Sequence, residues 1–258
     1  MKKDDLTIVK IGGKLINDND KLNEALDIFS QIEGQKILVH GGGREATIMA
    51  EKLGIETKMI QGRRITDADT IKLVTMVYAG DINKRIVAQL QKRDIDAIGL
   101  SGADANVIQS HKRVTDEIDY GFVGDVDKVN STRLQMMLNI GLVPVLSPIT
   151  HDKKGLLLNT NADTIAAMTS MAFVPTHNVH LKFCFEFPGV MYDLNDPKGM
   201  IPELSEAQIP EMVQNGTISK GMLPKIKNGF NAKSNGVEHV IICGLGNLLD
   251  SETATQLI

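Results

Sequence analysis

The chain has 258 residues and a formal net charge of −4, with 28 lysines and arginines against 32 aspartates and glutamates. This length is enough for one large α/β domain or two closely joined lobes with a substantial core. The basic residues are scattered along the sequence, which argues against a nucleic-acid or membrane-surface partner and favours a small molecule.

Residues 1–13 hold lysines, aspartates and only a short apolar run. Because this pattern is typical of neither a signal peptide nor a membrane span, we expect a cytoplasmic protein. Cys184 and Cys243 each lie in an apolar run and are predicted to be buried core thiols rather than a disulfide or redox pair. His177 and His180 have no third metal ligand nearby, so we expect a loop and a strand-edge position and no metal site.

Aliphatic and β-branched runs predict a series of buried strands. They span 6–13, 36–43, 97–104, 142–149, 179–189 and 239–246. Helical spacing of apolar residues predicts one helix between the first two strands and another after the second. The predicted buried faces of these helices are Leu22, Ala25, Phe29 and Ile32, and then Ala46, Met49, Ala50 and Leu53. The alternation predicts an α/β fold with an open, mostly parallel sheet covered by helices on both faces.

Two later segments depart from this alternation. Residues 113–128 have the turn residues and short apolar runs of hairpin strands, and could form a flap near a ligand site. The proline-bearing segment 173–178 follows a helix rich in alanine and methionine and precedes a new strand. It is therefore the expected boundary between two lobes.

Lys10 lies inside an otherwise apolar strand, just before Gly12 and Gly13. Because burial of an unpaired ammonium is costly, we expect its amine to meet an anion at the carboxyl end of the strand, where ligands bind in open sheets. Phosphate is the obvious candidate. The alternative is an edge strand with the lysine facing water.

The segment 40–44, HGGGR, follows the second predicted strand. Glycines let backbone N–H groups approach a ligand closely, and the following helix adds the positive end of its dipole. The segment lacks the GK[ST] ending of a P-loop and the G-x-G-x-x-G spacing of a dinucleotide site. It predicts a place for a phosphate or carboxylate, although a tight turn is the alternative.

Adjacent arginines, Arg63 and Arg64, precede Thr66, Asp67 and Asp69. Arginine suits bidentate recognition of a carboxylate. A surface cluster of salt bridges fits the same pattern equally well.

Three further polar residues, Asn159, Asn161 and Asp163, precede a helix rich in small residues. Alternate residues of an extended segment share a face, so they are expected at one site, with Asn161 or Asp163 also capping the helix. Lys225 comes after a glycine-containing turn and before a predicted helix. A second lysine matters because phosphoryl transfer requires several fixed cations around the transferring charge.

Taken together, KIGG, VHGGGR, GRRIT, NTNAD and GMLPK, in this order and at these separations, resemble the N-acetylglutamate kinase family of the amino acid kinase superfamily. The resemblance covers essentially the whole chain. It implies an open three-layer αβα sandwich with two lobes. It also implies an enzyme that uses ATP to phosphorylate the side-chain γ-carboxylate of an N-acylated glutamate, early in arginine biosynthesis. The family pattern gives acylglutamate binding and dimerisation to residues 1–174 and ATP binding to residues 175–258.

The resemblance implies catalytic roles for three residues. Lys10 and Lys225 match the lysines that flank the transferring phosphoryl group, and Asp163 matches the aspartate that holds both lysines in place. The attacking carboxylate is already ionised at neutral pH, so no general base is required. Magnesium is expected to arrive with ATP, since the sequence offers no dedicated carboxylate cage and no metal ligands of its own.

The resemblance also implies the binding residues. Arg64 and Asn159 match the residues that hold the α-carboxylate of the substrate. Glycines whose N–H groups contact the phosphoryl group and the substrate carboxylate are matched by Gly12, Gly13, Gly42 and Gly43. The nucleotide is expected to contact Glu186, Phe187, Pro188, Gly189, Val190, Met191, Thr217, Ile218 and Ser219.

Two positions depart from the family pattern. Glu186 and the bulky Phe187 stand where an aspartate and a small residue are common. Arg63 stands where acetyl-specific enzymes usually have an apolar residue near the acyl methyl group. Because a guanidinium there could pair with a second carboxylate, we hypothesise N-succinyl-L-glutamate rather than N-acetyl-L-glutamate as the preferred substrate. An Arg63 side chain that faces solvent is the alternative.

Arginine feedback in this family goes with a helix ahead of the first strand that links dimers into hexamers, whereas here the first strand is predicted from residue 6. The resemblance thus predicts an arginine-insensitive homodimer. Competing interpretations are a carbamate, aspartate or nucleoside monophosphate kinase of the same superfamily, and a non-catalytic nucleotide or amino-acid sensor. The paired arginines favour an acidic amino-acid substrate, and the two lysines with Asp163 favour catalysis.

Overall fold

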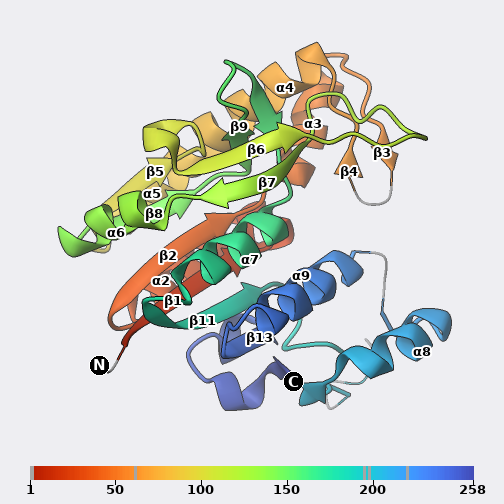
Figure 1. Cartoon of the computed structure of the whole chain (residues 1–258). Helices are drawn as coiled ribbons and strands as arrows, with labels where there is room; N and C mark the ends of the chain where they lie inside the picture. The colour runs from red at the N-terminus through yellow and green to blue at the C-terminus, as the bar shows by residue number, and fades with distance from the viewer. Residues whose placement is uncertain (1–2, 61–62, 194–195, 197–198, 219–220) are drawn as a thin grey trace.

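An eight-stranded sheet forms the centre of the computed structural model, which describes the chain apart from residues 1–2, 61–62, 194–195, 197–198 and 219–220 (Figure 1). Neighbouring strands in this sheet are parallel except for the β13–β14 pair. In sheet order the strands are β12 (Glu203–Leu204), β14 (Thr255–Leu257), β13 (His239–Cys243), β11 (His177–Cys184), β1 (Asp4–Ile11), β2 (Gln35–His40), β8 (Val143–Leu146) and β5 (Ala97–Leu100). The predicted open, mostly parallel sheet is confirmed.

The β1–β11 pairing is the seam between two halves of this sheet. It runs in register from Asp4 opposite His177 to Ile11 opposite Cys184. On one side lie strands of residues 1–174, and on the other side lie strands of residues 175–258. The carboxyl ends of β1 and β11 therefore meet in the middle of the sheet, where parallel strands leave their helix-facing loops side by side.

Helices cover both faces of the sheet, which gives the three-layer arrangement. One face is covered by α2 (Asn19–Ser30), α3 (Gly43–Lys52), α4 (Ala68–Val74), the π-helix η1 (Thr75–Ile82) and α5 (Asn83–Gln91). The other face is covered by α6 (Ser131–Asn139), α7 (Ala162–Phe173), α8 (Ile209–Gln214) and α9 (Leu223–Ser234). Each face buries its own apolar cluster, so the strands are apolar on both sides.

Alternation along β1 decides where its lysine points. Leu6 and Ile8 belong to the apolar cluster under α7, whereas Val9 and Ile11 belong to the opposite cluster. Successive side chains of a strand point to opposite faces. Lys10 therefore faces α7 from an interior strand, which excludes the alternative of an edge strand facing water.

A smaller four-stranded sheet lies above the main sheet in Figure 1, beside the first half of the chain. Its order is β10 (Leu157–Asn159), β9 (Ile149–His151), β6 (Ile108–Lys112) and β7 (Gly124–Val129). The predicted hairpin within 113–128 is only partly right: β7 lies there and pairs with β6 in antiparallel fashion, but β6 ends at Lys112, and residues 113–123 form the connection between the two strands. A short ribbon of β3 (Met59–Ile60) and β4 (Arg63–Arg64) lies to its right.

Short helical turns complete the secondary structure. These are α1 (Gly13–Ile16), η2 (Asp104–Asn106), η3 (Glu206–Gln208), η4 (Leu245–Asn247) and η5 (Ser251–Thr253). In the part of the chain that is described, no helix is long and apolar enough to cross a membrane.

The predicted burial of the two cysteines is confirmed, whereas the predicted positions of two histidines need correction. Cys184 and Cys243 are buried and opposite each other on β11 and β13. His177 is the first residue of β11 and His180 lies inside this interior strand, so neither histidine is in a loop.

The predicted inner face of α3 is only half right. Ala46 and Ala50 are buried, but Met49 is 40% exposed and Leu53 is 57% exposed. The buried face of α3 thus consists of small alanines, and the larger apolar side chains lie at the surface. An exposed apolar strip on α3 is the result.

Candidate active site

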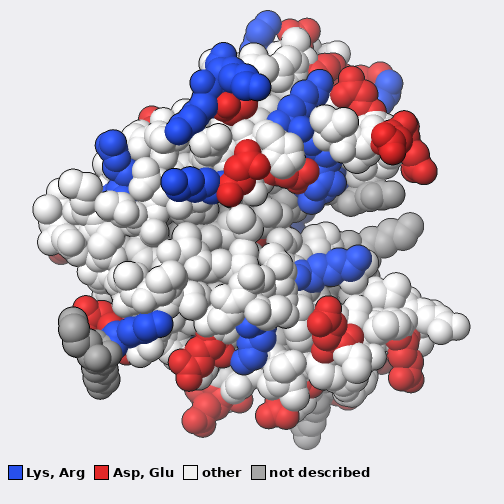
Figure 2. Space-filling view, in the orientation of Figure 1, with Lys and Arg blue, Asp and Glu red and all other residues white. Residues whose placement is uncertain are grey.

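Two cavities meet at the carboxyl ends of the central strands. The first, of about 210 Å³, is lined by residues from the first half of the chain, including Lys10, Arg64 and Asp163. The second, of about 570 Å³, lies between α1, α3 and the second half of the chain. Gly13 and Gly43 line both cavities. Figure 2 shows the corresponding notch on the right-hand side of the molecule.

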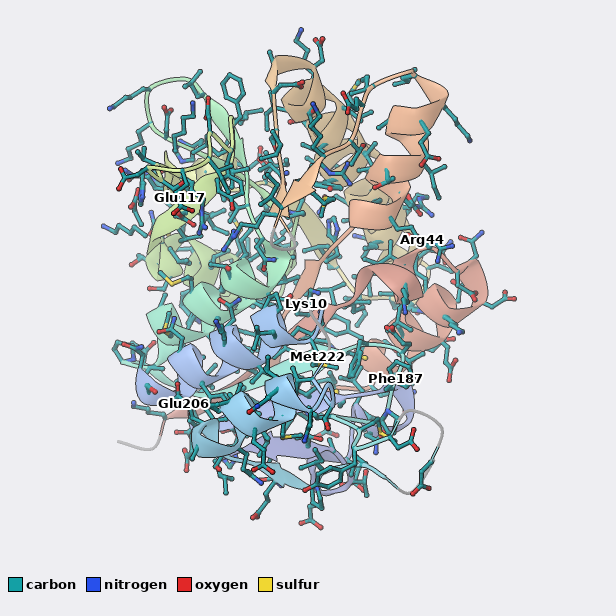
Figure 3. All side chains as sticks on the ribbon, turned by 90° about the vertical axis from the view of Figure 1, so that its right-hand side faces the viewer. Lys10, Arg44, Glu117, Phe187, Glu206 and Met222 are labelled. Atoms are coloured by element: carbon teal, nitrogen blue, oxygen red, sulfur yellow. The ribbon has the colours of Figure 1, made fainter. Side chains whose placement is uncertain are left out.

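Figure 3 looks onto this side and shows how the two halves face each other. Arg44 belongs to the upper half, Phe187 and Met222 belong to the lower half, and Lys10 lies between them. A molecule that occupied both cavities would pass over the end of β1. The junction of the cavities is thus the place where two ligands could react.

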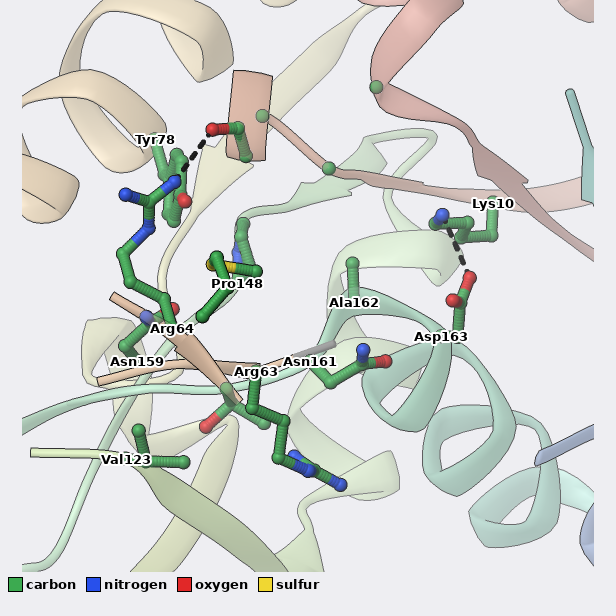
Figure 4. Close-up of a pocket in the computed structure, with 16 residues that line it drawn as sticks. Lys10, Arg63, Arg64, Tyr78, Val123, Pro148, Asn159, Asn161, Ala162 and Asp163 are labelled. Atoms are coloured by element: carbon green, nitrogen blue, oxygen red, sulfur yellow. Dashed lines mark hydrogen bonds and ion pairs between the residues drawn. The ribbon is translucent and has the colours of Figure 1, made fainter. Parts of the chain in front are cut away.

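Lys10, Asp163 and Lys225 form a buried charged triad at this junction. The Lys10 Nζ lies 2.8 Å from Asp163 Oδ1 (Figure 4), and the Lys225 Nζ lies 3.5 Å from Asp163 Oδ2. Lys10 comes from β1, Asp163 from the first turn of α7 and Lys225 from the first turn of α9. The prediction placed Lys225 before its helix, whereas α9 already begins at Leu223.

The triad keeps two cations beside one anion in a site shielded from water. Burial lowers the pKa of Lys10, against the attraction of Asp163. For Asp163 burial alone would raise the pKa, but Lys10 and Lys225 together outweigh it and lower the pKa. Asp163 is therefore ionised at neutral pH, and the triad carries one excess positive charge when both lysines are protonated. Such a site attracts a phosphate or a carboxylate.

The glycines at the junction leave room that the protein itself does not need. A Cβ atom on Gly43 would meet no atom within 4 Å, and one on Gly13 would meet only the Gly42 nitrogen at 3.9 Å. Gly42 differs, because its Cβ would lie 2.5 Å from Ile82 Cδ1 and 2.8 Å from Tyr78 Cδ1. Packing thus explains Gly42, and open space for a ligand is the remaining reason for Gly13 and Gly43.

Gly12 requires a correction. Its N–H donates to the carbonyl oxygen of Cys184 at 2.8 Å, so it is occupied by the sheet rather than directed at a ligand. The N–H groups of Gly13, Gly42 and Gly43 donate to no acceptor within the described residues. The expected role of Gly12 as a donor to a phosphoryl group is therefore not supported by its hydrogen bonding.

Arg64 is held firmly inside the first cavity. Its guanidinium donates to the Gly43 carbonyl at 2.8 Å, to Thr47 Oγ1 at 2.7 Å and to Thr57 Oγ1 at 3.0 Å. Asp67 instead caps α4, and Asp69 pairs with Lys72. This arrangement contradicts the alternative of a surface salt-bridge cluster for Arg64, because its partners are neutral and its positive charge stays available.

The NTNAD segment supplies the opposite wall of the first cavity (Figure 4). The Asn159 amide donates to Thr66 Oγ1 at 3.0 Å. Asn161 is the N-cap of α7 and accepts from the Thr164 N–H. Asn159, Asn161 and Asp163 all line the cavity, which confirms that they lie at one site.

Arg63 lines the same cavity and lies near a second group of charged residues, which contains Arg113 and Asp125. Burial and the neighbouring Arg113 lower its pKa, whereas Asp125 and Tyr120 act in the opposite direction. Arg113 itself pairs with Asp125 at 2.5 Å and lies over the Tyr120 ring. Arg63 thus lies near a second guanidinium and near a carboxylate that is already paired with it, and Arg63 does not simply face solvent.

The second cavity contains most, but not all, of the expected nucleotide residues. Lining residues that the sequence predicted are Gly12, Gly13, Glu186, Phe187, Gly189, Val190, Met191 and Thr217. Pro188 lines a neighbouring cavity instead. The predicted nucleotide contact of Ile218 needs correction. Its side chain is buried in the apolar core, and its N–H donates to the Met212 carbonyl. Ser219 lies outside the described residues.

Sequence reasoning missed several residues that complete the site. Thr47 and Thr57 fix Arg64, and Tyr78 lines the first cavity. Lys14 pairs with Glu186 at 2.6 Å across the wall of the second cavity. Of these four residues, only Thr47 could have been linked to the site from the sequence, because it follows Gly43 by one helical turn. Among the described residues no group of three or more His, Cys, Asp or Glu side chains could hold a metal ion.

Comparisons with known proteins agree with this geometry. The family model described as "Amino acid kinase family" matches residues 5–244. An acetylglutamate kinase of Bacteroides fragilis is 49% identical over 255 residues, which cover 99% of this chain and 97% of the relative. An acetylglutamate kinase of Phocaeicola vulgatus is 53% identical over 240 residues, or 93% of each chain.

Among solved structures, a carbamate kinase from Giardia lamblia bound to AMP-PNP superposes with a TM-score of 0.69 at 11% identity, covering 100% of this chain and 98% of that one. This likeness shows the fold alone. The open αβα sandwich is the fold of the amino acid kinases. The chain belongs to that family and, by its full-length identity to curated relatives, to the acetylglutamate kinases within it.

Proposed function

We propose that the enzyme transfers the γ-phosphoryl group of ATP to the side-chain γ-carboxylate of an N-acyl-L-glutamate, a step of arginine biosynthesis. The observation that carries this proposal is the junction of two cavities over one charged triad, with Lys10 lining the first cavity and Lys225 lining the second. A carboxylate oxygen attacks the γ-phosphorus, and the bond from that phosphorus to the β–γ bridging oxygen breaks. The products are an acyl phosphate and ADP.

In this proposal the lysines neutralise the transferring group. Lys10 and Lys225 contact the equatorial oxygens of the γ-phosphoryl group, and Asp163 fixes both amines. The Gly42 and Gly43 N–H groups hold the attacking carboxylate, and Gly13 contacts the phosphoryl group. The substrate carboxylate has an ordinary pKa near 4.3 and is ionised at neutral pH, so positioning and charge neutralisation supply the catalysis.

The α-carboxylate of the substrate is assigned to Arg64 and Asn159. Arg64 is already fixed by two threonines and a carbonyl group, so little side-chain entropy is lost when it binds a carboxylate. Asn159 lies in the same cavity. In this assignment the side chain of the substrate extends toward the triad.

ATP is assigned to the second cavity, with residues 1–174 as the acceptor lobe and residues 175–258 as the nucleotide lobe. Glu186, Phe187, Gly189, Val190 and Thr217 line its walls. Magnesium would be held chiefly by phosphate oxygens, since the acidic groups at the junction are paired with lysines. When bound, it would neutralise phosphate charge. Because ATP is the co-substrate, we place the enzyme in the cytoplasm.

For the acyl group we propose succinyl. Arg63 lines the first cavity, and the nearby Asp125 is already paired with Arg113. A terminal carboxylate on the acyl chain would therefore balance the guanidinium of Arg63. N-succinyl-L-glutamate has such a carboxylate, whereas N-acetyl-L-glutamate ends in a methyl group. Partial burial of Arg63 strengthens a pairing of this kind relative to water.

Trapping the acyl phosphate with hydroxylamine in the presence of MgATP tests both parts of the function. We expect a hydroxamate with at least one of the two acylglutamates and a higher kcat/KM with the succinyl compound. In Arg63→Met the preference should shift toward the acetyl compound by about 10-fold or more. No hydroxamate with either substrate contradicts the kinase activity, whereas a clear preference for acetyl in the unmodified enzyme contradicts only the succinyl assignment.

We further propose a homodimer formed through α3. Ile48, Met49 and Leu53, on and just after α3, and Met76 on the adjoining η1 are at least 40% exposed. An apolar strip of this kind is costly in water and favours association. Light scattering should give twice the monomer mass, and Leu53→Glu should shift the protein to the monomer. A monomer in the unmodified protein contradicts this proposal.

A further inference from the structure

The glycine turn that follows β2 is anchored by a buried side chain that the proposed chemistry does not use. His40 is completely buried, and its Nδ1 lies 2.8 Å from the carbonyl oxygen of Gly41. Its Nε2 lies 3.1 Å from Asn83 Nδ2. Asn83 is also completely buried and donates from the same nitrogen to the Val145 carbonyl at 2.9 Å.

The partners determine the tautomer of the imidazole. A carbonyl oxygen only accepts, so Nδ1 must carry the proton that is donated to Gly41. In a neutral ring Nε2 is then an acceptor, which matches the Asn83 amide donor. Burial lowers the pKa of His40 to about 4 despite the Gly41 bond, and Lys10, Arg85 and Lys84 oppose protonation further. The ring is therefore neutral at physiological pH.

The bond to Gly41 fixes the orientation of the next N–H group. The Gly41 carbonyl and the Gly42 N–H belong to one peptide unit, and no peptide bond in the described chain is cis. In a trans peptide the C=O and N–H vectors point in opposite directions. Because the carbonyl is held toward the imidazole, the Gly42 N–H points away from it, and Gly42 lines the first cavity.

A glycine–glycine peptide needs such an anchor. Neither residue has a Cβ atom to limit rotation, so the peptide plane between them can turn over at small steric cost. On the other side of the turn, Tyr78 and Ile82 of η1 pack against Gly42. The π-helix also ends directly before Asn83, and π-helical segments are frequent at functional sites.

We propose that His40 and Asn83 are positioning residues for phosphoryl transfer. Asn83 holds the His40 ring, and His40 holds the Gly41–Gly42 peptide with its N–H directed at the attacking carboxylate. The pair touches neither substrate. This inference rests on the proposed function only in the identity of the group that the Gly42 N–H meets.

Two variants of His40 separate the two hydrogen bonds. His40→Asn places an amide nitrogen where Nδ1 was and retains a donor for Gly41, but it cannot reach Asn83. His40→Gln places its amide where Nε2 was and retains the partner for Asn83, but it loses the bond to Gly41. Both variants remove the ring, so their loss of packing is similar.

We expect His40→Gln to lower kcat by about 10-fold or more, with the KM for ATP changed by less than about threefold. His40→Asn should recover most of that kcat, although its thermal stability falls as much. As a control, Lys36→Met removes a buried lysine at the other end of β2, where it binds carbonyl groups at the end of α2. It should lower stability without changing kcat.

Equal kcat values for His40→Gln and His40→Asn, or an unchanged kcat in His40→Gln, would overturn the proposal.

If the His40 variants do not fold, Asn83→Asp provides a second test. Its carboxylate requires a proton on Nε2, so the neutral ring loses its Nδ1 donor, and only the doubly protonated ring keeps both bonds. The kcat of Asn83→Asp should therefore fall as the pH rises through the pKa of His40, and a pH profile parallel to that of the unmodified enzyme contradicts the proposal. Hydroxamate formation in the unmodified enzyme tests the kinase function separately.

Discussion

The two cavities differ in how completely the protein prepares them for a ligand. In the first, of about 210 Å³, Arg64 has three hydrogen-bond acceptors and Asn159 is bonded to Thr66. In the second, of about 570 Å³, the walls are largely backbone and apolar side chains, and its acidic residue Glu186 pairs with Lys14. The polar side chains of the acceptor cavity are thus already held in place by hydrogen bonds, whereas the nucleotide cavity mainly provides volume for a ligand.

The difference predicts where substitutions will act. Preorganised polar groups carry specificity and transition-state stabilisation, so their loss should affect kcat or acceptor KM strongly. Apolar walls contribute many small contacts, so any one of them should matter less.

Lys10→Met should have the largest effect. It removes a cation from the junction and leaves the Met side chain in a similar volume, so we expect kcat to fall by about 10²–10³-fold with a much smaller change in the KM for ATP. Lys182→Met is the matched control, because Lys182 is a buried lysine on the adjoining strand that donates to the Leu248 carbonyl. Steady-state kinetics that show equal turnover for Lys10→Met would remove Lys10 from the mechanism.

Asp163→Asn should lower the free energy of unfolding by about 3 kcal/mol at pH 7, because it leaves two lysines without their shared partner. The pKa of Asp163 is lower in the folded protein than its ordinary value of 3.8. Its stabilisation is therefore complete above pH 3.8 and is lost as the pH falls through the lower, folded-state pKa. Urea denaturation should show the difference between the two proteins narrowing at acid pH. A pH-independent difference contradicts the ionised state of Asp163.

Arg64→Lys should raise the KM for the acylglutamate by about 10-fold while the KM for ATP changes little. A lysine keeps the charge but cannot contact Gly43, Thr47 and Thr57 in one plane as the guanidinium does. Initial rates at saturating ATP measure the change. A rise in the KM for ATP instead would mean that the cavities are wrongly assigned.

Phe187→Val should have the smallest effect, with a rise of about three- to fivefold in the KM for ATP and an unchanged kcat. The ring lines the nucleotide cavity and packs edge-on against Phe185 at 5.8 Å between centroids. Val213→Ala, at an exposed position on α8, is a control for changes in this half of the chain. If Phe187→Val changed the KM for the acylglutamate and not the KM for ATP, the assignment of ATP to the second cavity would be wrong.

Much of the fold followed from local patterns in the sequence. The strand runs around Lys10 and His40 and the capped helices after Asp18 and Asn161 lie close to where the structure has them. Hydrophobic periodicity identifies such elements because a strand or helix must bury a continuous face. It failed for Met49 and Leu53, since the periodicity does not say whether an apolar side chain meets the sheet or remains at the surface.

Parts of the site depend on contacts between distant segments and could not be predicted in this way. The Gly12 N–H is taken by Cys184, which is far along the chain but adjacent through the β1–β11 pairing. Ile218 is directed into the core by the packing of the segment around Met212. The His40–Asn83 pair joins β2 to the end of a π-helix whose extra residue per turn leaves no signal in the sequence.

The kinds of chemical group at the site can be read from the order of the motifs. They supply Lys10, the glycine turn, Arg64, Asp163 and Lys225, and each residue type limits the chemistry that it can perform. Which of these groups share a cavity, and which donors find no acceptor among the described residues, follows from the fold and not from the motifs. This dependence arises from the parallel sheet. It places strand ends that are distant in the chain at one edge, and there a single peptide orientation in ILVHGGGR is set by a histidine held from another element.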